Sequence, residues 1–160
     1  MAKTASKKIL WIDDDINRFP LMPYIDEFKE QGFTIIGVEN PDEIEEKLSS
    51  NNNDFLCIIV DISMPLGSKI NSGEAIGGMQ TGLVILKELV ENANLNKIKK
   101  VVFTITDNSK VKTYCSTQNP PIPYFQKQKY LADAFVNEII EITTNQQPIK
   151  QTNNARRKKN

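Results

Sequence analysis

The sequence predicts an α/β protein in which helices cover both faces of a parallel β-sheet. The clearest signal is the apolar run at residues 55–60, which is hydrophobic at successive positions and is therefore typical of a strand buried on both faces. Further short apolar runs alternate with segments of helical spacing, so the chain contains five βα units. We predict the flavodoxin-like strand order 2-1-3-4-5, which places a crevice between the first and third strands.

The strands follow from the apolar runs, and the helices follow from the amphipathic segments between them. We expect strands at residues 9–12, 33–38, 55–60, 101–105 and 124–126. We expect helices at residues 23–31, 41–50, 80–91, 108–117 and 131–142.

The prediction of the first two helices is supported by prolines, a glycine and a capping residue at their ends. Pro20 and Pro23 predict an irregular turn before the first helix, and Gly32 suits the position just after its end. Asn40 is a good N-cap for the second helix because Pro41 follows at the first helical position.

The composition is that of one globular domain with an uneven distribution of charge. The 160 residues are 39% hydrophobic, which is enough to build a core. The last eleven residues hold five bases and no acid, so the rest of the chain has 15 bases against 20 acids. This acidic body argues against a nucleic-acid-binding fold. We expect a domain over residues 7–142 and a disordered basic tail over residues 143–160, which is too short for a fused DNA-binding domain.

Several functional classes are excluded by what the sequence lacks. Two cysteines set no disulfide framework, and without histidine there is no Cys/His cluster for zinc. The apolar run at residues 9–12 is too short for a signal-peptide core or a membrane span, so we expect a cytoplasmic protein without membrane contact. Residues 66–81 hold four glycines but no phosphate-binding glycine motif, and we expect a long functional loop there.

Polar side chains follow four of the five predicted strands. Asp13 and Asp14 follow the first strand, Asp61 the third, Thr106 the fourth and Lys127 the fifth. Because the carboxyl ends of parallel strands meet at one edge of a sheet, we expect these side chains in one site. Clustered carboxylates repel unless a cation neutralises them, and their hard oxygens suit Mg²⁺. A carboxylate beside Mg²⁺ can attack phosphorus, while a lysine and a hydroxyl group stabilise the phosphoryl oxygens.

Taken together, the motifs ILWIDDD, IIVDISMP, VVFTIT and YFQK resemble the receiver domain of two-component response regulators. The resemblance spans about residues 7–142. It implies that Asp61 is the phosphoacceptor. It also implies that Mg²⁺ is held by Asp13, Asp14, Asp61 and the backbone carbonyl of Ser63.

The resemblance assigns three further residues and a function. Thr106 and Lys127 would contact the phosphoryl group, and Tyr124 would be the aromatic side chain that reorients on activation. The chain would be a stand-alone, CheY-like response regulator that catalyses at most its own phosphorylation and dephosphorylation. A histidine kinase or a histidine-containing phosphotransfer protein would donate the phosphoryl group, and an unknown downstream protein would receive the signal.

The sequence departs from the family pattern at several positions, and Pro20 and Pro23 are unusual for the first helix. The glycine expected soon after the Met-Pro pair comes only at Gly82, after an insertion. Gln128 stands where the family usually has proline after the lysine, and Asp107 replaces a small residue.

Two other functions fit parts of the pattern. The first is a receiver-like module that binds partners without being phosphorylated. The second is a phosphatase similar to the haloacid dehalogenases, whose nucleophile motif Asp13 and Asp15 imitate. The phosphatase hypothesis gives Asp61 no role. It also requires an acidic pair near the end of the sequence to bind the metal, and the sequence has none there.

Overall fold

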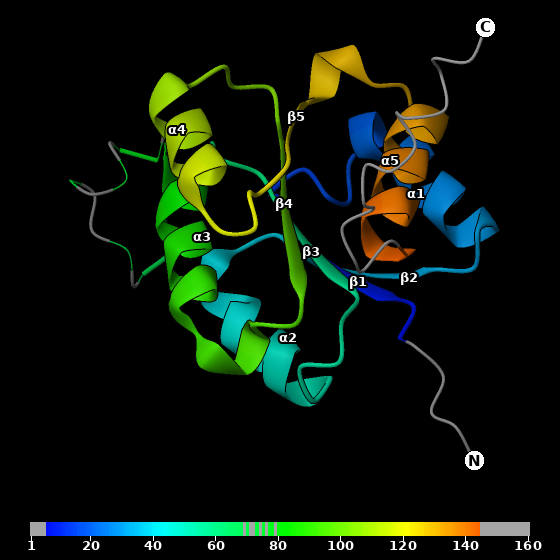
Figure 1. Ribbon diagram of the computed structural model, residues 1–160, viewed down its shortest axis with the longest axis horizontal. Helices are drawn as coiled ribbons and strands as arrows, with labels where there is room; N and C mark the ends of the chain where they lie inside the picture. Colours follow the sequence, from blue (N-terminus) through cyan, green and yellow to red (C-terminus); the bar gives the residue numbers. More distant parts are fainter. Residues whose placement is uncertain are drawn as a thin grey trace, which may run out of the picture.

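The structure is a computed structural model that describes residues 6–68, 70, 73, 75, 77, 78 and 80–144. Within these residues, one five-stranded sheet has the order β2-β1-β3-β4-β5, and every neighbouring pair of strands is parallel (Figure 1). The predicted fold class and strand order are therefore confirmed. The strands are β1 (Lys8–Ile12), β2 (Thr34–Val38), β3 (Cys57–Val60), β4 (Lys99–Thr104) and β5 (Tyr124–Gln126).

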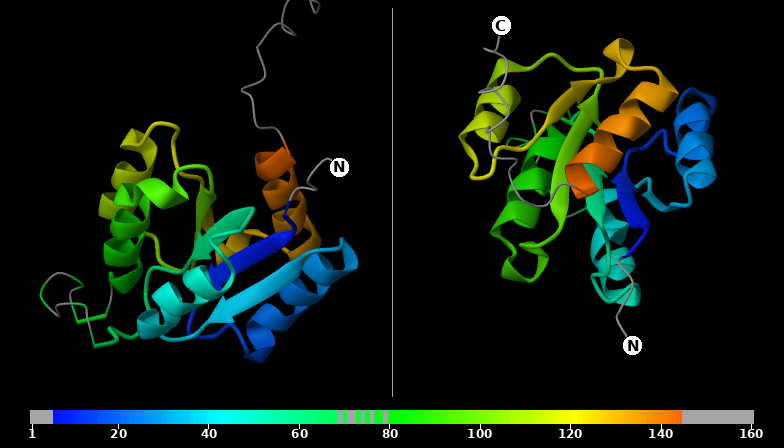
Figure 2. Two further views of the ribbon diagram at one scale, coloured as in Figure 1. Left: turned by 90° about the horizontal axis from the view of Figure 1, so that it is seen from below. Right: turned by 45° about the vertical axis from the view of Figure 1, so that its right-hand side comes forward.

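The helices form a layer on each face of the sheet. Helices α1 and α5 lie side by side on one face, and α2, α3 and α4 cover the other (Figures 1 and 2). Their bounds are α1 (Met22–Glu30), α2 (Ile44–Ser50), α3 (Thr81–Glu91), α4 (Ser109–Thr117) and α5 (Ala132–Thr144).

The two helical layers explain why the strands are apolar at successive positions. On β1, Leu10 packs toward the core under α2, α3 and α4, while Trp11 packs toward the core under α1 and α5. The second core is rich in aromatic side chains, and the rings of Phe103 and Phe135 stack at 3.7 Å. Each such aromatic pair adds about 0.5–1.5 kcal/mol beyond its buried area, so β4 is held firmly against α5.

The predicted helix ends are largely confirmed. Gly32 has φ +92°, its N–H donates to the Lys29 carbonyl at 2.9 Å, and the N–H of Phe33 donates to the Phe28 carbonyl at 3.0 Å. This pair of bonds is a Schellman motif, which requires a left-handed residue. The side chain of Asn40 accepts from the N–H of Asp42 at 2.9 Å.

Most boundaries differ from the expectation by one to three residues, and β3 begins at Cys57 and not at residue 55. The turn after Asn40 is a 3₁₀ helix (Pro41–Glu43), so α2 itself begins later. Strand β4 begins and ends earlier than predicted, and its last residue is Thr104. Helix α5 continues to Thr144, beyond the predicted end at residue 142, and the remainder of the predicted tail lies outside the described residues. No described helix combines the length and apolar character needed to cross a membrane.

Gly82 lets the first turn of α3 pack directly on the backbone that follows β3. Its N–H donates to the Ile62 carbonyl at 2.8 Å, and a Cβ at this position would lie 1.9 Å from the Asp61 carbonyl oxygen. The hydroxyl group of Thr81 donates to the Met64 carbonyl at 2.7 Å. Although the insertion delays this glycine in the sequence, the fold brings it against the candidate phosphoacceptor.

Substituting this glycine should therefore displace the residues around Asp61. We expect Gly82→Ala to lower the free energy of unfolding by about 3 kcal/mol, because the new methyl group overlaps backbone atoms that cannot move aside. In an open helical position the same change would be stabilising. Urea denaturation of wild type and variant measures the loss.

The matched control is Gly32→Ala, whose methyl group would meet no atom within 4 Å. It should cost only the strain of its positive φ, about 1–2 kcal/mol. An equal or smaller loss for Gly82→Ala would contradict the close-approach argument.

Candidate functional site

Asp61 lies at the carboxyl end of β3 and is almost fully buried, with 6% of its surface exposed. Its N–H donates to the Ile12 carbonyl at 2.9 Å, which continues the pairing of β3 with β1. Its Oδ1 accepts from the N–H of Ile62 at 2.8 Å, so one carboxylate oxygen is held by its own backbone turn. The second oxygen, Oδ2, faces Lys127.

Asp13 and Asp14 follow the neighbouring strand β1. Asp13 has no exposed surface, and its Oδ1 accepts from the N–H of Asp15 at 2.8 Å. Asp14 is partly exposed. The acidic pair thus presents one buried and one accessible carboxylate at the edge of the sheet where Asp61 lies.

Lys127 joins these two strand ends. Its Nζ donates to Oδ2 of Asp13 at 2.8 Å and to Oδ2 of Asp61 at 3.4 Å. The predicted meeting of Asp13, Asp61 and Lys127 at one site is therefore what the structure shows. A single ammonium group is shared by two carboxylates from different strands.

Two hydrogen bonds fix the loop that carries Lys127, although Gln128 stands where a proline was expected. Gln128 donates from its amide nitrogen to the Ile105 carbonyl at 3.1 Å. The hydroxyl group of Tyr24 donates to the Tyr130 carbonyl at 2.6 Å, which links the loop to α1. Hydrogen bonds thus hold this segment at the position where a proline was expected.

Burial and neighbouring charges shift the pKa values of the acidic residues and of the lysine in this site. The pKa of Asp13 is raised from 3.8 to about 6, first by burial and next by the charge of Asp61, against the opposing charge of Lys127. Burial also raises the pKa of Asp61 and of Asp14. Burial alone would lower the pKa of Lys127, but the charges of Asp61 and Asp13 outweigh it and the pKa is raised.

The raised pKa of Asp13 means that its ionisation opposes folding. A protonated Asp13 favours the folded state, so its contribution is full below about pH 3.8 and is lost as the pH rises through about 6. At neutral pH an added cation would relieve the surplus negative charge.

The hydroxyl group beside the carboxylate of Asp61 belongs to Thr104, which corrects the prediction of Thr106. Thr104 is the last residue of β4 and is fully buried, and its side chain lies close enough to Asp61 to lower the pKa of that carboxyl group. Thr106 is two residues further on and partly exposed, and its N–H donates to Oγ1 of Thr104 at 3.3 Å. The strand ends earlier than predicted, so the buried hydroxyl group at its end comes from Thr104 and not from Thr106.

Tyr124 and Ser63 lie at the margin of the site. The hydroxyl group of Tyr124 donates to the Thr106 carbonyl and accepts from the N–H of Asn108 at 3.4 Å. The ammonium group of Lys112 lies 5.5 Å from the centre of the Tyr124 ring. Ser63 is exposed in the segment that directly follows Asp61.

The chemistry of the donor set fits a hard divalent cation such as Mg²⁺. Carboxylate oxygens of Asp13, Asp14 and Asp15 all lie within 4.8 Å of one another. Asp15 also pairs with Arg18 at 3.2 Å, which leaves Asp13 and Asp14 as the better candidates. Oxygen ligands and surplus negative charge are what Mg²⁺ requires.

The chain matches known proteins in its structure but not in its sequence. No protein-family model matches the chain, and no curated protein matches it. A response regulator receiver domain from Clostridium thermocellum is similar, with 18% identity, a TM-score of 0.63, and coverage of 88% of this chain and 95% of that one. The chemotaxis protein CheY4 from Vibrio cholerae has 15% identity, a TM-score of 0.63, and coverage of 86% and 99%.

A third similar structure is described as the CheX–CheY–BeF₃–Mg complex from Borrelia burgdorferi. It has 17% identity, a TM-score of 0.63, and coverage of 88% of this chain and 90% of that one. The chain therefore has the fold of response regulator receiver domains. Within that class it is similar to CheY-like domains over most of its length.

The assignment of the buried threonine can be tested by titration. We expect Thr104→Val to raise the pKa of Asp61 further, because the hydroxyl group of Thr104 favours the charged form of that carboxyl group. Thr106→Val should leave that pKa unchanged, since its side chain makes no described contact with Asp61. NMR detection of the Asp61 carboxyl carbon against pH, in EDTA, provides the measurement. A larger rise in Thr106→Val than in Thr104→Val would restore the original assignment.

Proposed function

We propose that this chain is a phosphorylatable receiver that accepts a phosphoryl group on Asp61 and signals through protein–protein contacts. The observation that carries the proposal is the Lys127 ammonium group, which lies within hydrogen-bond reach of Asp13 and Asp61. A nucleophilic carboxylate, a cation for the phosphoryl oxygens and an acidic pair thus occupy one edge of the sheet.

The reaction proposed for Asp61 is an in-line displacement at phosphorus. A carboxylate oxygen of Asp61 forms a bond to phosphorus as the phosphorus–nitrogen bond of a phosphohistidine breaks. The electron pair of that bond leaves with the donor imidazole. Because the chain contains no histidine, the donor is a histidine kinase or a histidine-containing phosphotransfer protein. Lys127 offsets the charge on the phosphoryl oxygens, and the hydroxyl group of Thr104 can donate to one of them.

Asp13, Asp14, Asp61 and the Ser63 carbonyl are the proposed ligands of Mg²⁺. When bound, the ion would supply the positive charge that neutralises the carboxylates and the phosphoryl oxygens. Asp61 must be ionised to act as a nucleophile, and its raised pKa works against ionisation. Lys127 favours the ionised form from within the chain.

Tyr124 is the proposed reporter of phosphorylation to a downstream protein. Its hydroxyl group bonds to the Thr106 carbonyl, and Thr106 in turn contacts Thr104. A hydrogen bond from Thr104 to a phosphoryl group would move this short chain of contacts and free Tyr124 to reorient. The proposed output surface is therefore the face of α4, β5 and α5.

No observation favours the phosphatase alternative. The backbone N–H of Asp15 donates to the carboxylate of Asp13. The Asp15 side chain forms an ion pair with Arg18 on the surface. Asp61, which that mechanism leaves unused, lies 3.4 Å from the Lys127 ammonium group that also contacts Asp13.

Phosphorylation should be detectable with a small donor. Incubation with acetyl phosphate and Mg²⁺ should add the mass of one phosphoryl group in an acid-labile form, and Asp61→Asn should abolish the gain. Asp26→Asn, an exposed carboxylate on α1, is the matched control and should behave as wild type. Intact-protein mass spectrometry gives the result. A gain retained in Asp61→Asn would reject this phosphoacceptor, and an unmodified wild type would support the module that works without phosphorylation.

Metal binding should raise thermal stability through the acidic pair. At Mg²⁺ concentrations about tenfold above Kd, binding stabilises the folded state by about 1.4 kcal/mol. For a chain of this length that is a rise of roughly 3–6 °C in Tm. Asp14→Asn should remove most of the rise, because it deletes an accessible ligand without disturbing the buried pair of Asp13 and Lys127. Differential scanning fluorimetry with and without EDTA measures the effect, and an undiminished rise in Asp14→Asn would place the ion elsewhere.

A further inference from the structure

A hollow of about 890 Å³ lies at the edge of the sheet opposite Asp61. Its walls include residues 54–56 before β3, residues 96–100 at the start of β4, and residues 118–123 before β5. Because all strands of a parallel sheet begin at the same edge, these segments gather at the amino end, away from the phosphorylation site. The hollow has the size of a pocket for a small organic ligand.

Lysine side chains dominate the charge of this hollow. Lys97, Lys99 and Lys100 line it, and Asp54 is the one acidic residue among its lining. None of the three lysines forms an ion pair with a carboxylate of the described part of the chain. The ammonium group of Lys100 donates to the Leu95 carbonyl, so Lys97 and Lys99 are the cations left to meet an anion.

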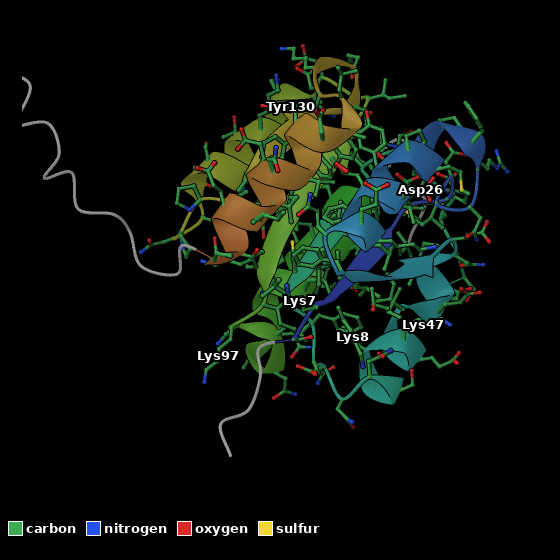
Figure 3. The ribbon with its side chains drawn as sticks, turned by 90° about the vertical axis from the view of Figure 1, so that its right-hand side faces the viewer. Lys7, Lys8, Asp26, Lys47, Lys97 and Tyr130 are labelled. Atoms are coloured by element: carbon green, nitrogen blue, oxygen red, sulfur yellow. The ribbon has the colours of Figure 1, made fainter. Side chains whose placement is uncertain are left out.

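Three further lysines lie at the same end of the molecule as this hollow. Figure 3 shows Lys97 at the same end of the molecule as Lys7, Lys8 and Lys47, while Tyr130, which follows β5, lies at the other end. Positive charge gathered on one side of a small domain raises the local concentration of anions. An anionic ligand would therefore be drawn to this edge and repelled by the acidic edge.

The remaining lining is suited to the uncharged part of a ligand. Pro120, Pro121 and Pro123 provide apolar surface, and the side chains of Asn96 and Asn119 provide amide donors and acceptors. An apolar wall with a few polar groups is the usual composition of a small-molecule site.

Backbone hydrogen bonds hold the proline-rich wall in place. The N–H of Ile122 donates to the Cys115 carbonyl at 3.0 Å, and the N–H of Val102 donates to the Pro123 carbonyl at 2.9 Å. The wall is thus anchored to both α4 and β4. A preformed wall lowers the entropy cost of binding.

We propose that this hollow binds a phosphorylated small molecule of nucleotide size. Its phosphate groups would lie against Lys97 and Lys99, and its ring system would pack on the wall formed by Pro120, Pro121 and Pro123. The site is separate from Asp61 and does not depend on phosphorylation there.

The test uses ATP as the probe and the full chain in EDTA at low ionic strength. EDTA removes the divalent cations that could bring ATP to the acidic edge, and low salt preserves the lysine contribution. In an NMR titration, saturable shifts should appear at the amides of residues 97–100, 118, 119 and 122, with Kd below about 1 mM. The double variant Lys97→Gln/Lys99→Gln should bind roughly tenfold more weakly, because two charge-assisted contacts are lost.

The matched control is Lys29→Gln/Lys110→Gln, which removes the same charge from exposed positions elsewhere. It should change Kd by no more than about twofold. The single variant Lys97→Gln, at an exposed side chain, replaces the double variant if that one fails to fold.

Adenosine and pyrophosphate separate the two halves of the proposed ligand, and each should bind much more weakly than ATP. Three results would each overturn the proposal. These are the absence of saturable shifts at the named residues, equal weakening in the control variant, or pyrophosphate binding as tightly as ATP. The last two would show that general charge attraction, rather than a built pocket, explains the effect.

Discussion

One ammonium group holds the site together. The Nζ atom of Lys127 is shared between Asp13 and Asp61, and the three side chains are nearly excluded from solvent. Burial raises the pKa of both acids, and the charge of Asp61 raises that of Asp13 further, so the two carboxylates are only partly compensated by one ammonium group. A further cation is stabilised in such a place, and a phosphoryl group can be accepted only while cations balance its charge. Charge balance therefore governs what this site can do.

The fold must offset the cost of gathering these charges. Removing one partner of a buried ion pair typically costs 3–5 kcal/mol, because the other charge is left without compensation. The strands that deliver Asp13 and Asp61 are buried on both faces, and the stacked rings of Phe103 and Phe135 fasten β4 to α5. Gly82 has no side chain and therefore allows α3 to contact the backbone at Asp61. The apolar core thus keeps the strand ends close enough for Lys127 to reach both acids.

The sequence predicted the charged cluster well where a residue directly follows a predicted strand. Asp13, Asp61 and Lys127 each do so, and a parallel sheet brings such positions together. The buried hydroxyl group was misplaced because the segment VVFTIT carries two threonines two residues apart, which face the same side of a strand. The two threonines are distinguished by the end of β4, which lies between them. Thr104 is still in the strand and pairs with Gln126, the residue before Lys127. That register depends on contacts between distant segments, and hydrophobic periodicity does not encode it.

Parallel topology also places the hollow and the acidic cluster at opposite ends of the sheet. Residues that precede strands collect at one edge, where lysines occur, and residues that follow strands collect at the other, where aspartates occur. Strand β4, Lys99–Thr104, separates the edges by roughly 20 Å at about 3.3 Å per residue. That is more than twice the screening length of about 8 Å at physiological salt. Charges at one edge therefore have little direct effect on the other, and any coupling between them must pass through the packing of β4 and β5.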